Sequence, residues 1–332
     1  MPAAGYPVGM KPRCIGVLTG GGDAPGMNAC VRAVVRTALA QGVRVAGIRR
    51  AYDGLVRGDL CKLTARDVGG IIQRGGTVLQ TARFPAFADL DAQRDGLAQL
   101  KSFGVDALVA IGGDGTMRGA LALHRLGLPV IGIPASIDND VYGTDIAIGV
   151  DTALNTIIEA IDKLRDTASS HQRAFIVETM GRNCGHLALV AGIISGAEMT
   201  LIPEQPVTAG EVAEAVRDSR ARGKSYAIIV VSEGASLNAT ELKKQLDAMR
   251  LGYDFRVTIL GHVQRGGSPG AWDRLIAARF GVNAVERLLK GESGCMVGLS
   301  ARELRAVPLE EAGTRQRAPD MEFYRMARML AQ

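Results

Sequence analysis

Two carboxylates follow directly on an apolar run, in the segment PASIDND (134–140). The run LPVIGIP (128–134) predicts a buried strand, so Asp138 and Asp140 stand where that strand ends. Aspartate and asparagine are common turn residues, and one interpretation is that they only turn the chain and cap a helix. The other is that a carboxylate acts as a general base on a ligand bound there. The turn interpretation suits Asn139 and Asp140 and leaves Asp138 available for chemistry.

Two further predicted strand ends are rich in glycine. TGGGDAPGMN (19–28) leaves backbone amides open just before a helix, which favours an anion such as phosphate. IGGDGT (111–116) places Asp114 among glycines at the start of another helix, and a carboxylate beside bound phosphate suits Mg²⁺. A plain tight turn and a helix cap are the structural alternatives. Neither segment has the spacing GxGxxG or the Walker spacing, so only the two together favour a nucleotide phosphate with a metal.

Several arginines lie next to the predicted strands or in their glycine-rich loops. The planar guanidinium group matches phosphate with two parallel hydrogen bonds, whereas a single arginine is by default a solvated surface residue. For an arginine at a strand end, phosphate binding is favoured over a solvated surface position. The residues concerned are Arg83, Arg173, Arg182, Arg256 and Arg265, with His262 three residues before the last of them.

Strand-like and helix-like segments alternate along most of the chain and must position these side chains. Continuous apolar runs predict strands at 14–20, 43–49, 106–113, 128–134, 174–181, 198–204, 226–234 and 257–263. Amphipathic spacing predicts helices at 26–42, 152–168 and 208–223. Strands that are apolar on both faces are typical of parallel sheets covered by helices, in an α/β fold. Such folds bind ligands at the carboxyl ends of their strands.

Composition narrows the class of protein. The chain has 332 residues, enough for two domains, with 47% hydrophobic residues, 22% charged residues and 42 glycines. The net charge of +5 is scattered, and aromatic residues make up only 4%, so small anions are favoured as partners over nucleic acid. The five cysteines are dispersed without a CxxC pair, which indicates neither a disulfide framework nor a zinc site. No apolar stretch has membrane-spanning length, and we expect a cytoplasmic protein.

The motifs GGDAPGMN, IGGDGT, SIDND, SSHQR, ETMGR and GHVQRGGSP, in this order, resemble those of bacterial-type ATP-dependent 6-phosphofructokinases. The resemblance extends from about residue 13 to residue 300. It implies an α/β fold of two interleaved Rossmann-like three-layer domains with mostly parallel sheets. The larger, ATP-binding domain is expected at 1–148 and 261–311, and the smaller, sugar-phosphate domain at 149–260 and 312–332. The resemblance also implies a homotetramer with shared sites.

The implied reaction is the glycolytic transfer of a phosphoryl group from Mg-ATP to the 1-hydroxyl of fructose 6-phosphate, giving fructose 1,6-bisphosphate and ADP. The resemblance makes Asp138 the base, with Ser136 and Asp140 beside it. It implies that Arg182 stabilises the charge on the transferring phosphoryl group. It assigns ATP to Gly21, Tyr52, Arg83, Phe84, Gly113, Asp114, Gly115 and Thr116, with Asp114 towards Mg²⁺. It assigns the sugar phosphate to Ser136, Ile137, Asp138, Arg173, Met180, Gly181, Arg182, Glu233, Arg256, His262, Val263, Gln264 and Arg265, with Arg173 and Arg256 reaching in from a neighbouring subunit.

The sequence departs from the family pattern at three places. Serine replaces the usual threonine at Ser136 and keeps a hydroxyl. Ala135 stands where ATP-dependent members commonly have glycine. Pyrophosphate-dependent members generally carry lysine at that position and aspartate at the position of Gly115, and since both residues are small here, ATP is favoured as donor. Arg32, Arg36, Arg165, Arg222, Lys224 and the backbone near Glu198 match the family's allosteric nucleotide site, yet Asp59 falls where an arginine is expected. A solvated helix face remains the alternative for Arg32 and Arg36.

Three other functions compete with this interpretation. A pyrophosphate-dependent phosphofructokinase is disfavoured by Gly115 and Ala135. A non-catalytic regulatory nucleotide-binding subunit would be expected to lose the base or the metal carboxylate, but Asp114, Asp138 and Arg182 are all present. A dinucleotide-binding dehydrogenase would carry the fingerprint that this chain lacks.

Overall fold

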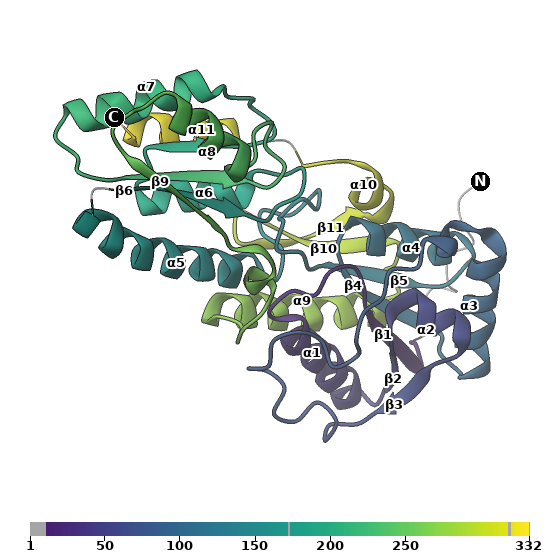
Figure 1. Cartoon of the computed structure of the whole chain (residues 1–332). Helices are drawn as coiled ribbons and strands as arrows, with labels where there is room; N and C mark the ends of the chain where they lie inside the picture. Colours follow the sequence, from purple (N-terminus) through teal and green to yellow (C-terminus); the bar gives the residue numbers. More distant parts are fainter. Residues whose placement is uncertain (1–10, 172, 318–319, 332) are drawn as a thin grey trace. The chain divides into compact units, whose positions relative to one another are not determined.

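A computed structural model describes residues 11–171, 173–317 and 320–331 (Figure 1). The chain forms two units and passes between them repeatedly. The first unit holds the chain up to Ser136, Val141–Asp151 and Arg265–Arg317. The second holds Ile137–Asp140, Thr152–Gln264 and the described residues after Arg317. This division differs from the boundaries expected from the sequence at residues 137–140, 149–151, 261–264 and 312–317.

A seven-stranded sheet forms the centre of the first unit's described residues, in the order β11-β10-β5-β4-β1-β2-β3. The five inner strands run parallel, and the two edge strands pair antiparallel with their neighbours. Its strands are β1 (Cys14–Thr19), β2 (Arg44–Ile48), β3 (Leu60–Leu63), β4 (Ala107–Gly112), β5 (Val130–Pro134), β10 (Cys295–Ser300) and β11 (Glu303–Pro308).

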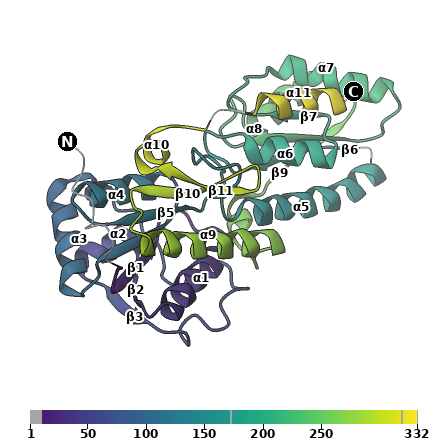
Figure 2. The ribbon, with the colours of Figure 1, turned by 180° about the vertical axis from the view of Figure 1, so that it is seen from behind.

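Helices cover both faces of this sheet (Figures 1 and 2). On one face α1 (Met27–Ala40) lies against α9 (Ala271–Leu289), and Gly281 lets the two backbones approach, because a Cβ there would lie 2.7 Å from Ala33 Cβ. The other face carries α2 (Ala51–Arg57), the 3₁₀ turn η1 (Pro85–Ala88), α3 (Leu90–Ser102), α4 (Asp114–Arg125) and α10 (Leu309–Thr314), whose apolar side chains pack on the sheet around the fully buried Leu108 and Met117. The unit therefore has three layers.

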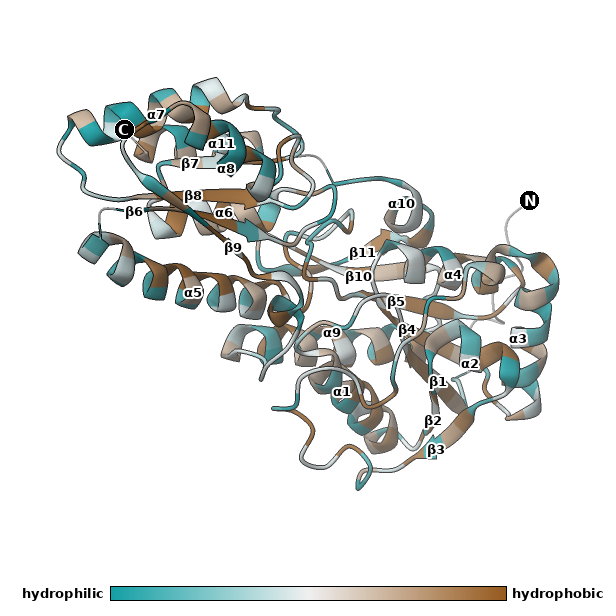
Figure 3. Cartoon of the chain, in the orientation of Figure 1, coloured by the Kyte–Doolittle hydropathy of each residue, from teal (hydrophilic) through white to brown (hydrophobic). Residues whose placement is uncertain are grey.

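A smaller parallel sheet, in the order β7-β8-β6-β9, forms the centre of the second unit's described residues. Its strands are β6 (Arg173–Thr179), β7 (Met199–Leu201), β8 (Ala227–Ser232) and β9 (Asp254–Ile259), followed by the 3₁₀ turn η2 (Gly261–Arg265). One face packs on α7 (Ala209–Ala221) and α8 (Ala239–Ala248) through side chains such as Val212, Val216 and Leu242. The remaining helices are α5 (Val150–His171), α6 (His186–Ser195) and α11 (Met321–Leu330). Figure 3 colours hydrophobic residues brown and hydrophilic residues teal, and β8 is mostly brown.

The predicted α/β class with mostly parallel sheets is confirmed, and each predicted strand and helix is present within a few residues of its expected ends. The strands β3, β10 and β11 were not predicted. β11 is mostly exposed and has no apolar run, while β10 contains Gly298, which interrupts the strand pattern. That glycine is required because a Cβ there would lie 2.2 Å from the Gly143 carbonyl oxygen.

The five cysteines form no disulfide in the described residues, as the sequence predicts. Burial raises the pKa of the Cys30 thiol, so this thiol stays protonated and unreactive. Among the described helices, none combines the length and apolar character needed to cross a membrane.

Candidate active site

The ends of β1, β4 and β5 lie next to one another in the first unit, because these strands are neighbours in the sheet. The Gly20 amide donates to the Ile111 carbonyl, 2.8 Å away, and joins the first glycine-rich loop to the second. A Cβ on Gly113 would lie 4.0 Å from Ser136 Cβ, which brings the third strand end to the same place. These three strand ends, up to Ser136, thus form one loop cluster within the first unit.

Glycine is required in this cluster by close packing. A Cβ on Gly20 would lie 2.7 Å from Thr116 Oγ1, and a Cβ on Gly112 would lie 2.4 Å from the Gly20 carbonyl oxygen. Gly21 is exposed and has φ +81, in the left-handed region that favours glycine. The backbone at Gly21 is consequently exposed at the point where a phosphate would approach.

Asp114 opens α4 with its side chain 42% exposed, and both its carboxylate oxygens have partners. One oxygen accepts from the Gly115 amide at 2.6 Å, and the other pairs with Arg118 Nη1 at 2.7 Å. Arg118 also donates to the Gly313 carbonyl at 3.3 Å. The N-cap residue of α4 is Gly113, so Asp114 is not the helix cap, and its carboxylate binds the amide of the next residue and Arg118. The i, i+4 spacing of Asp114 and Arg118 could have indicated the pair from the sequence.

No group of three or more His, Cys, Asp or Glu side chains that could hold a metal occurs in the described parts of the chain. Asp114 is instead a single exposed carboxylate beside an open glycine-rich backbone. That arrangement fits Mg²⁺, which usually takes one or two carboxylates together with phosphate oxygens and water.

Tyr52 supports the second loop from inside the protein. Its side chain is buried and stacks on Phe87, with ring centroids 4.2 Å apart. Its hydroxyl donates to the Thr116 carbonyl at 2.7 Å, and burial raises the pKa of Tyr52, which keeps this donor protonated. The structure thus places the Tyr52 hydroxyl on the backbone of the loop.

Arg83 and Phe84 follow a segment that is tied to the first loop. The Thr81 hydroxyl donates to the Gly21 carbonyl at 2.8 Å, and Arg83 itself is exposed. Arg265 reaches the other side of that loop, where its Nη1 donates to the Asp23 carbonyl at 3.2 Å. The guanidinium group fits there because residue 22 is glycine, whose Cβ would lie 2.2 Å from Nη1.

The carboxylate of Asp138 lies in the second unit and faces a cation. Its side chain is 3% exposed, and one of its oxygens lies 3.4 Å from Arg182 Nε. Asn139 next to it has φ 54, a left-handed conformation that asparagine tolerates. The turn interpretation therefore holds for Asn139, whereas Asp138 is buried beside an arginine, unlike an ordinary solvated turn residue. Ile137 is buried, and Asp140 is partly exposed.

The backbone that carries Arg182 is held by Glu233. One carboxylate oxygen of Glu233 accepts from the Gly181 amide at 3.2 Å and from the Arg182 amide at 2.8 Å. Arg182 has φ 50, a strained conformation for a side-chain-bearing residue, and such strain is common at functional sites. The Met180 amide donates to Gln264 Oε1 at 3.3 Å. These residues follow the carboxyl ends of β6, β8 and β9, and the exposed His262 and Val263 belong to η2.

Gly234 leaves room for the turn that carries Arg182, because a Cβ at position 234 would lie 1.8 Å from the Arg182 carbonyl oxygen. We therefore expect Gly234→Ala to reduce kcat by about tenfold or more. That atom is backbone, so the turn carrying Arg182 must shift. Gly210→Ala, in the first turn of α7, is a matched control, since its nearest neighbour is Thr208 Oγ1 at 3.7 Å. Steady-state kinetics with a thermal melt of both variants checks the expectation. Equal kcat in the two variants would contradict it. Sequence reasoning did not identify Gly234.

Arg173 and Arg256 lie at the opposite end of the second sheet. β6 starts at Arg173 and reaches the Arg182 turn only after Thr179, a span of about 20 Å. Asp254, at the start of β9, contacts both arginines: its Oδ2 lies 3.4 Å from Arg173 Nε and 2.7 Å from Arg256 Nη2. Within this unit the predicted substrate residues therefore form two groups, one at each end of the sheet.

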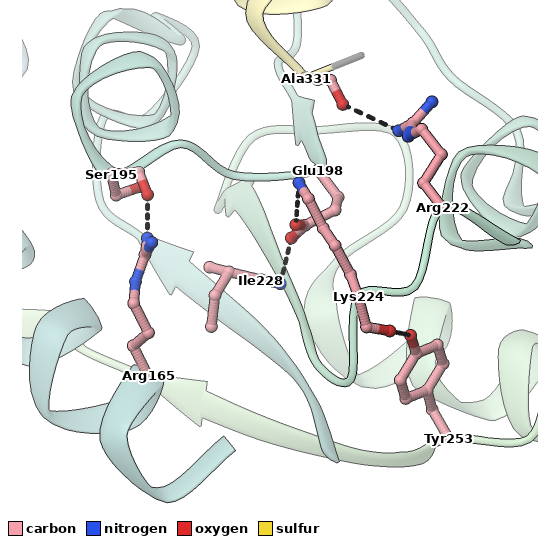
Figure 4. Close-up of polar contacts among 8 residues, drawn as sticks. All are labelled: Arg165, Ser195, Glu198, Arg222, Lys224, Ile228, Tyr253 and Ala331. Atoms are coloured by element: carbon pink, nitrogen blue, oxygen red, sulfur yellow. Dashed lines mark hydrogen bonds and ion pairs between the residues drawn. The ribbon is translucent and has the colours of Figure 1, made fainter. Parts of the chain in front are cut away.

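Figure 4 shows the second unit's residues of the predicted allosteric site. Glu198 is buried, pairs with Lys224 Nζ at 2.9 Å and accepts from the Ile228 amide at 2.6 Å. Arg165 donates to the Ser195 carbonyl, and Arg222 donates to the Ala331 carbonyl at 3.3 Å. Lys224, between α7 and β8, thus pairs with Glu198 directly, whereas Arg165, on α5, and Arg222, just after α7, bond to backbone carbonyls.

The other residues of that predicted site belong to the first unit. Arg32 and Arg36 lie on α1, where Arg36 is exposed, and Asp59 pairs with Arg49 at 3.7 Å. A carboxylate at position 59 is thus already engaged by a cation of its own unit.

Comparison with known proteins finds a matching family and named relatives. The Phosphofructokinase family model matches residues 14–288. An ATP-dependent 6-phosphofructokinase of Thermotoga neapolitana is 51% identical over 318 residues, covering 96% of this chain and 99% of the relative. ATP-dependent 6-phosphofructokinase 1 of Thermus thermophilus has the same identity and coverage.

Solved structures share the fold. The phosphofructokinase of Saccharomyces cerevisiae matches with a TM-score of 0.86 at 38% identity, over 96% of this chain and 48% of that chain. A pyrophosphate-dependent phosphofructokinase of Marinobacter aquaeolei matches with a TM-score of 0.85 at 20% identity, over 96% of this chain and 91% of that chain, which is evidence of the fold alone. By its family match and its identity to these relatives, the chain belongs to the phosphofructokinase family.

Proposed function

We propose that the protein transfers the γ-phosphoryl group of Mg-ATP to the 1-hydroxyl of fructose 6-phosphate. The observation that carries this proposal is the buried carboxylate of Asp138, 3.4 Å from the Arg182 guanidinium group. Phosphoryl transfer needs a base for the acceptor hydroxyl and positive charge for the phosphoryl oxygens, and this pair supplies both. Relatives about half identical in sequence are named ATP-dependent 6-phosphofructokinase, which supports the same reaction.

In this reaction Asp138 accepts the proton of the 1-hydroxyl. The hydroxyl oxygen forms the new bond to the γ-phosphorus, the bond from that phosphorus to the β,γ-bridging oxygen breaks, and ADP leaves. Arg182 neutralises charge that spreads over the transferring oxygens, and Glu233 keeps the Arg182 backbone in place through two amides. Ser136 and Asp140 flank the base in sequence, so covalent connection alone keeps Ser136 within about 7 Å of it.

The nucleotide site of this proposal is the loop cluster of the first unit. The amides of Gly21 and Gly22 and the N-terminus of α4 bind the phosphates, while Arg83 and Phe84 contact the rest of ATP. Asp114 would hold Mg²⁺, which shields the charge of the phosphates when bound. Gly115 leaves space there, because a Cβ would meet only Arg118 Nη2, at 3.5 Å. The small Ala135 and Gly115 favour ATP over pyrophosphate.

The substrate site requires a second subunit in this proposal. A sugar phosphate held at Asp138 and Met180 cannot reach Arg173 and Arg256 of the same chain, because those arginines lie about 20 Å away along β6. We therefore assign Arg173 and Arg256 to the 6-phosphate bound by a neighbouring copy, within a homotetramer. The cations around Glu198 are proposed to bind an allosteric nucleotide.

The test is a steady-state assay with fructose 6-phosphate and Mg²⁺ that compares ATP with pyrophosphate as donor and follows fructose 1,6-bisphosphate. We expect turnover with ATP and at least about 100-fold less with pyrophosphate, a difference of about 2.7 kcal/mol in transition-state binding. Turnover with pyrophosphate would refute the donor argument. Absence of turnover with both donors would instead favour a regulatory subunit.

A further inference from the structure

Among the described residues, Asp254 forms ion pairs with both arginines that are assigned to the phosphate, Arg173 and Arg256. Its Oδ2 accepts from Arg256 Nε at 3.0 Å and from Nη2 at 2.7 Å. The same oxygen lies 3.4 Å from Arg173 Nε. A single carboxylate oxygen therefore faces two guanidinium groups at once.

The sheet itself builds this arrangement. Asp254 and Arg256 are two residues apart on β9, and side chains at that spacing lie on the same face of a strand. Arg173 is the register partner of Asp254 on the neighbouring strand β6. The contact thus follows from strand pairing and does not depend on a loop. The spacing of Asp254 and Arg256 is visible in the sequence, but their pairing with Arg173 is not.

All three side chains are accessible to solvent: 31% of Arg173, 50% of Asp254 and 54% of Arg256 is exposed. An ion pair exposed to this degree contributes little to stability, because water and salt screen it. A stable structural role would favour burial. A carboxylate that occupies two arginines weakly is better suited to be displaced by a stronger anion.

We propose that Asp254 is an internal competitor of the substrate phosphate, occupying the donors of Arg173 and Arg256 until a phosphate dianion displaces it. This inference rests on the proposed function, which assigns those arginines to the 6-phosphate. A phosphate group carries more charge and more acceptor oxygens than a carboxylate, so it wins the exchange. Asp254 nevertheless lowers the affinity and keeps weaker anions off the arginines. It is a specificity-determining residue that does not touch the reacting atoms.

The experiment compares Asp254→Asn and Asp254→Ala with the unaltered enzyme at saturating Mg-ATP. We expect KM for fructose 6-phosphate to fall by about threefold to tenfold in both variants, with kcat and KM for ATP within twofold. Asp247→Asn is the matched control, because Asp247 is 45% exposed and pairs with Lys243 on α8, away from both arginines. KM for the sugar phosphate should stay unchanged in that control.

A positioning role gives the opposite pattern. If Asp254 only holds the arginines in place, Asp254→Ala raises KM for fructose 6-phosphate. Asp254→Asn keeps an acceptor oxygen and in that case does not lower this KM. That result overturns the proposal, and so does an unchanged KM in both variants.

A binding measurement separates this proposal from the assignment of the arginines. Inorganic phosphate should raise the melting temperature of Asp254→Asn more than that of the unaltered protein, and the difference should vanish in Asp254→Asn/Arg256→Ala. If the difference in melting temperature persists in the variant without Arg256, the proposed competition between Asp254 and phosphate at Arg173 and Arg256 is refuted. An unchanged KM for fructose 6-phosphate in Arg173→Ala would instead refute the proposed cross-subunit phosphate site.

Discussion

Asp138→Asn is expected to lower kcat by about 10²–10⁴-fold, the usual contribution of a positioned general base. Asparagine has nearly the same shape and fits the buried site beside Arg182, but it cannot accept the proton of the 1-hydroxyl. Since the base acts mainly in the transition state, KM for fructose 6-phosphate and for ATP should change by only a few fold. Steady-state kinetics with purified variant protein measures both quantities.

Two controls make this result interpretable. Circular dichroism and a thermal melt must show that Asp138→Asn is folded, because the residue is 2% exposed and a packing defect would also reduce activity. A variant that is folded and retains near-normal kcat would show that Asp138 only turns the chain, as its neighbour Asn139 does. The proposed mechanism would then lose its base.

Arg182→Gln carries the second large effect, a loss of about 10²–10³-fold in kcat, because a neutral side chain cannot stabilise the developing charge. The left-handed backbone at this position, and the hydrogen bonds that Glu233 accepts from the Gly181 and Arg182 amides, remain available in the glutamine variant. The loss should therefore reflect the missing charge more than a displaced turn. Arg182→Lys should recover part of the rate, since it restores the charge without the planar group.

The double variant Asp138→Asn/Arg182→Gln provides the control. If both residues act on the same transferring group, kcat of the double variant should lie close to that of the slower single variant. Fully multiplied losses would mean that the 3.4 Å contact between them has no functional coupling. In that case Arg182 would act on substrate independently of the base.

Much of the fold and site is predictable from the sequence, because apolar runs and glycine-rich strand ends are local patterns. β1, β4 and β5 bring their ends together as expected, since buried parallel strands leave few alternatives for where loops meet. The sequence does not reveal contacts between pairs of residues that lie far apart in the chain. The clash that Gly234 avoids with Arg182 and the contact of Asp254 with Arg173 depend on which strands become neighbours.

The role of Tyr52 illustrates the same limit. Its hydroxyl lies 2.7 Å from the Thr116 carbonyl, which comes from another helix and could not be identified from spacing. Likewise, the i, i+4 spacing of Arg118 and Asp114 only suggests a pair, whereas the contact of Arg118 with the Gly313 carbonyl at 3.3 Å could not be identified from spacing. Residue types at the strand ends are therefore predictable, whereas the side chains that support them require coordinates.

The strand order of the first unit has a consequence for biosynthesis. β5 ends at Pro134, but its outer neighbour β10 begins only at Cys295, and the helix α9 that covers it spans Ala271–Leu289. While the ribosome makes the whole second sheet, β5 leaves an unpaired edge on the nascent chain, which is a hazard for aggregation. The sheet can close only near the end of translation. Release of the nascent chain from the ribosome before Cys295 is made, for example at a premature stop codon, should therefore yield a product that depends on chaperones and is readily degraded.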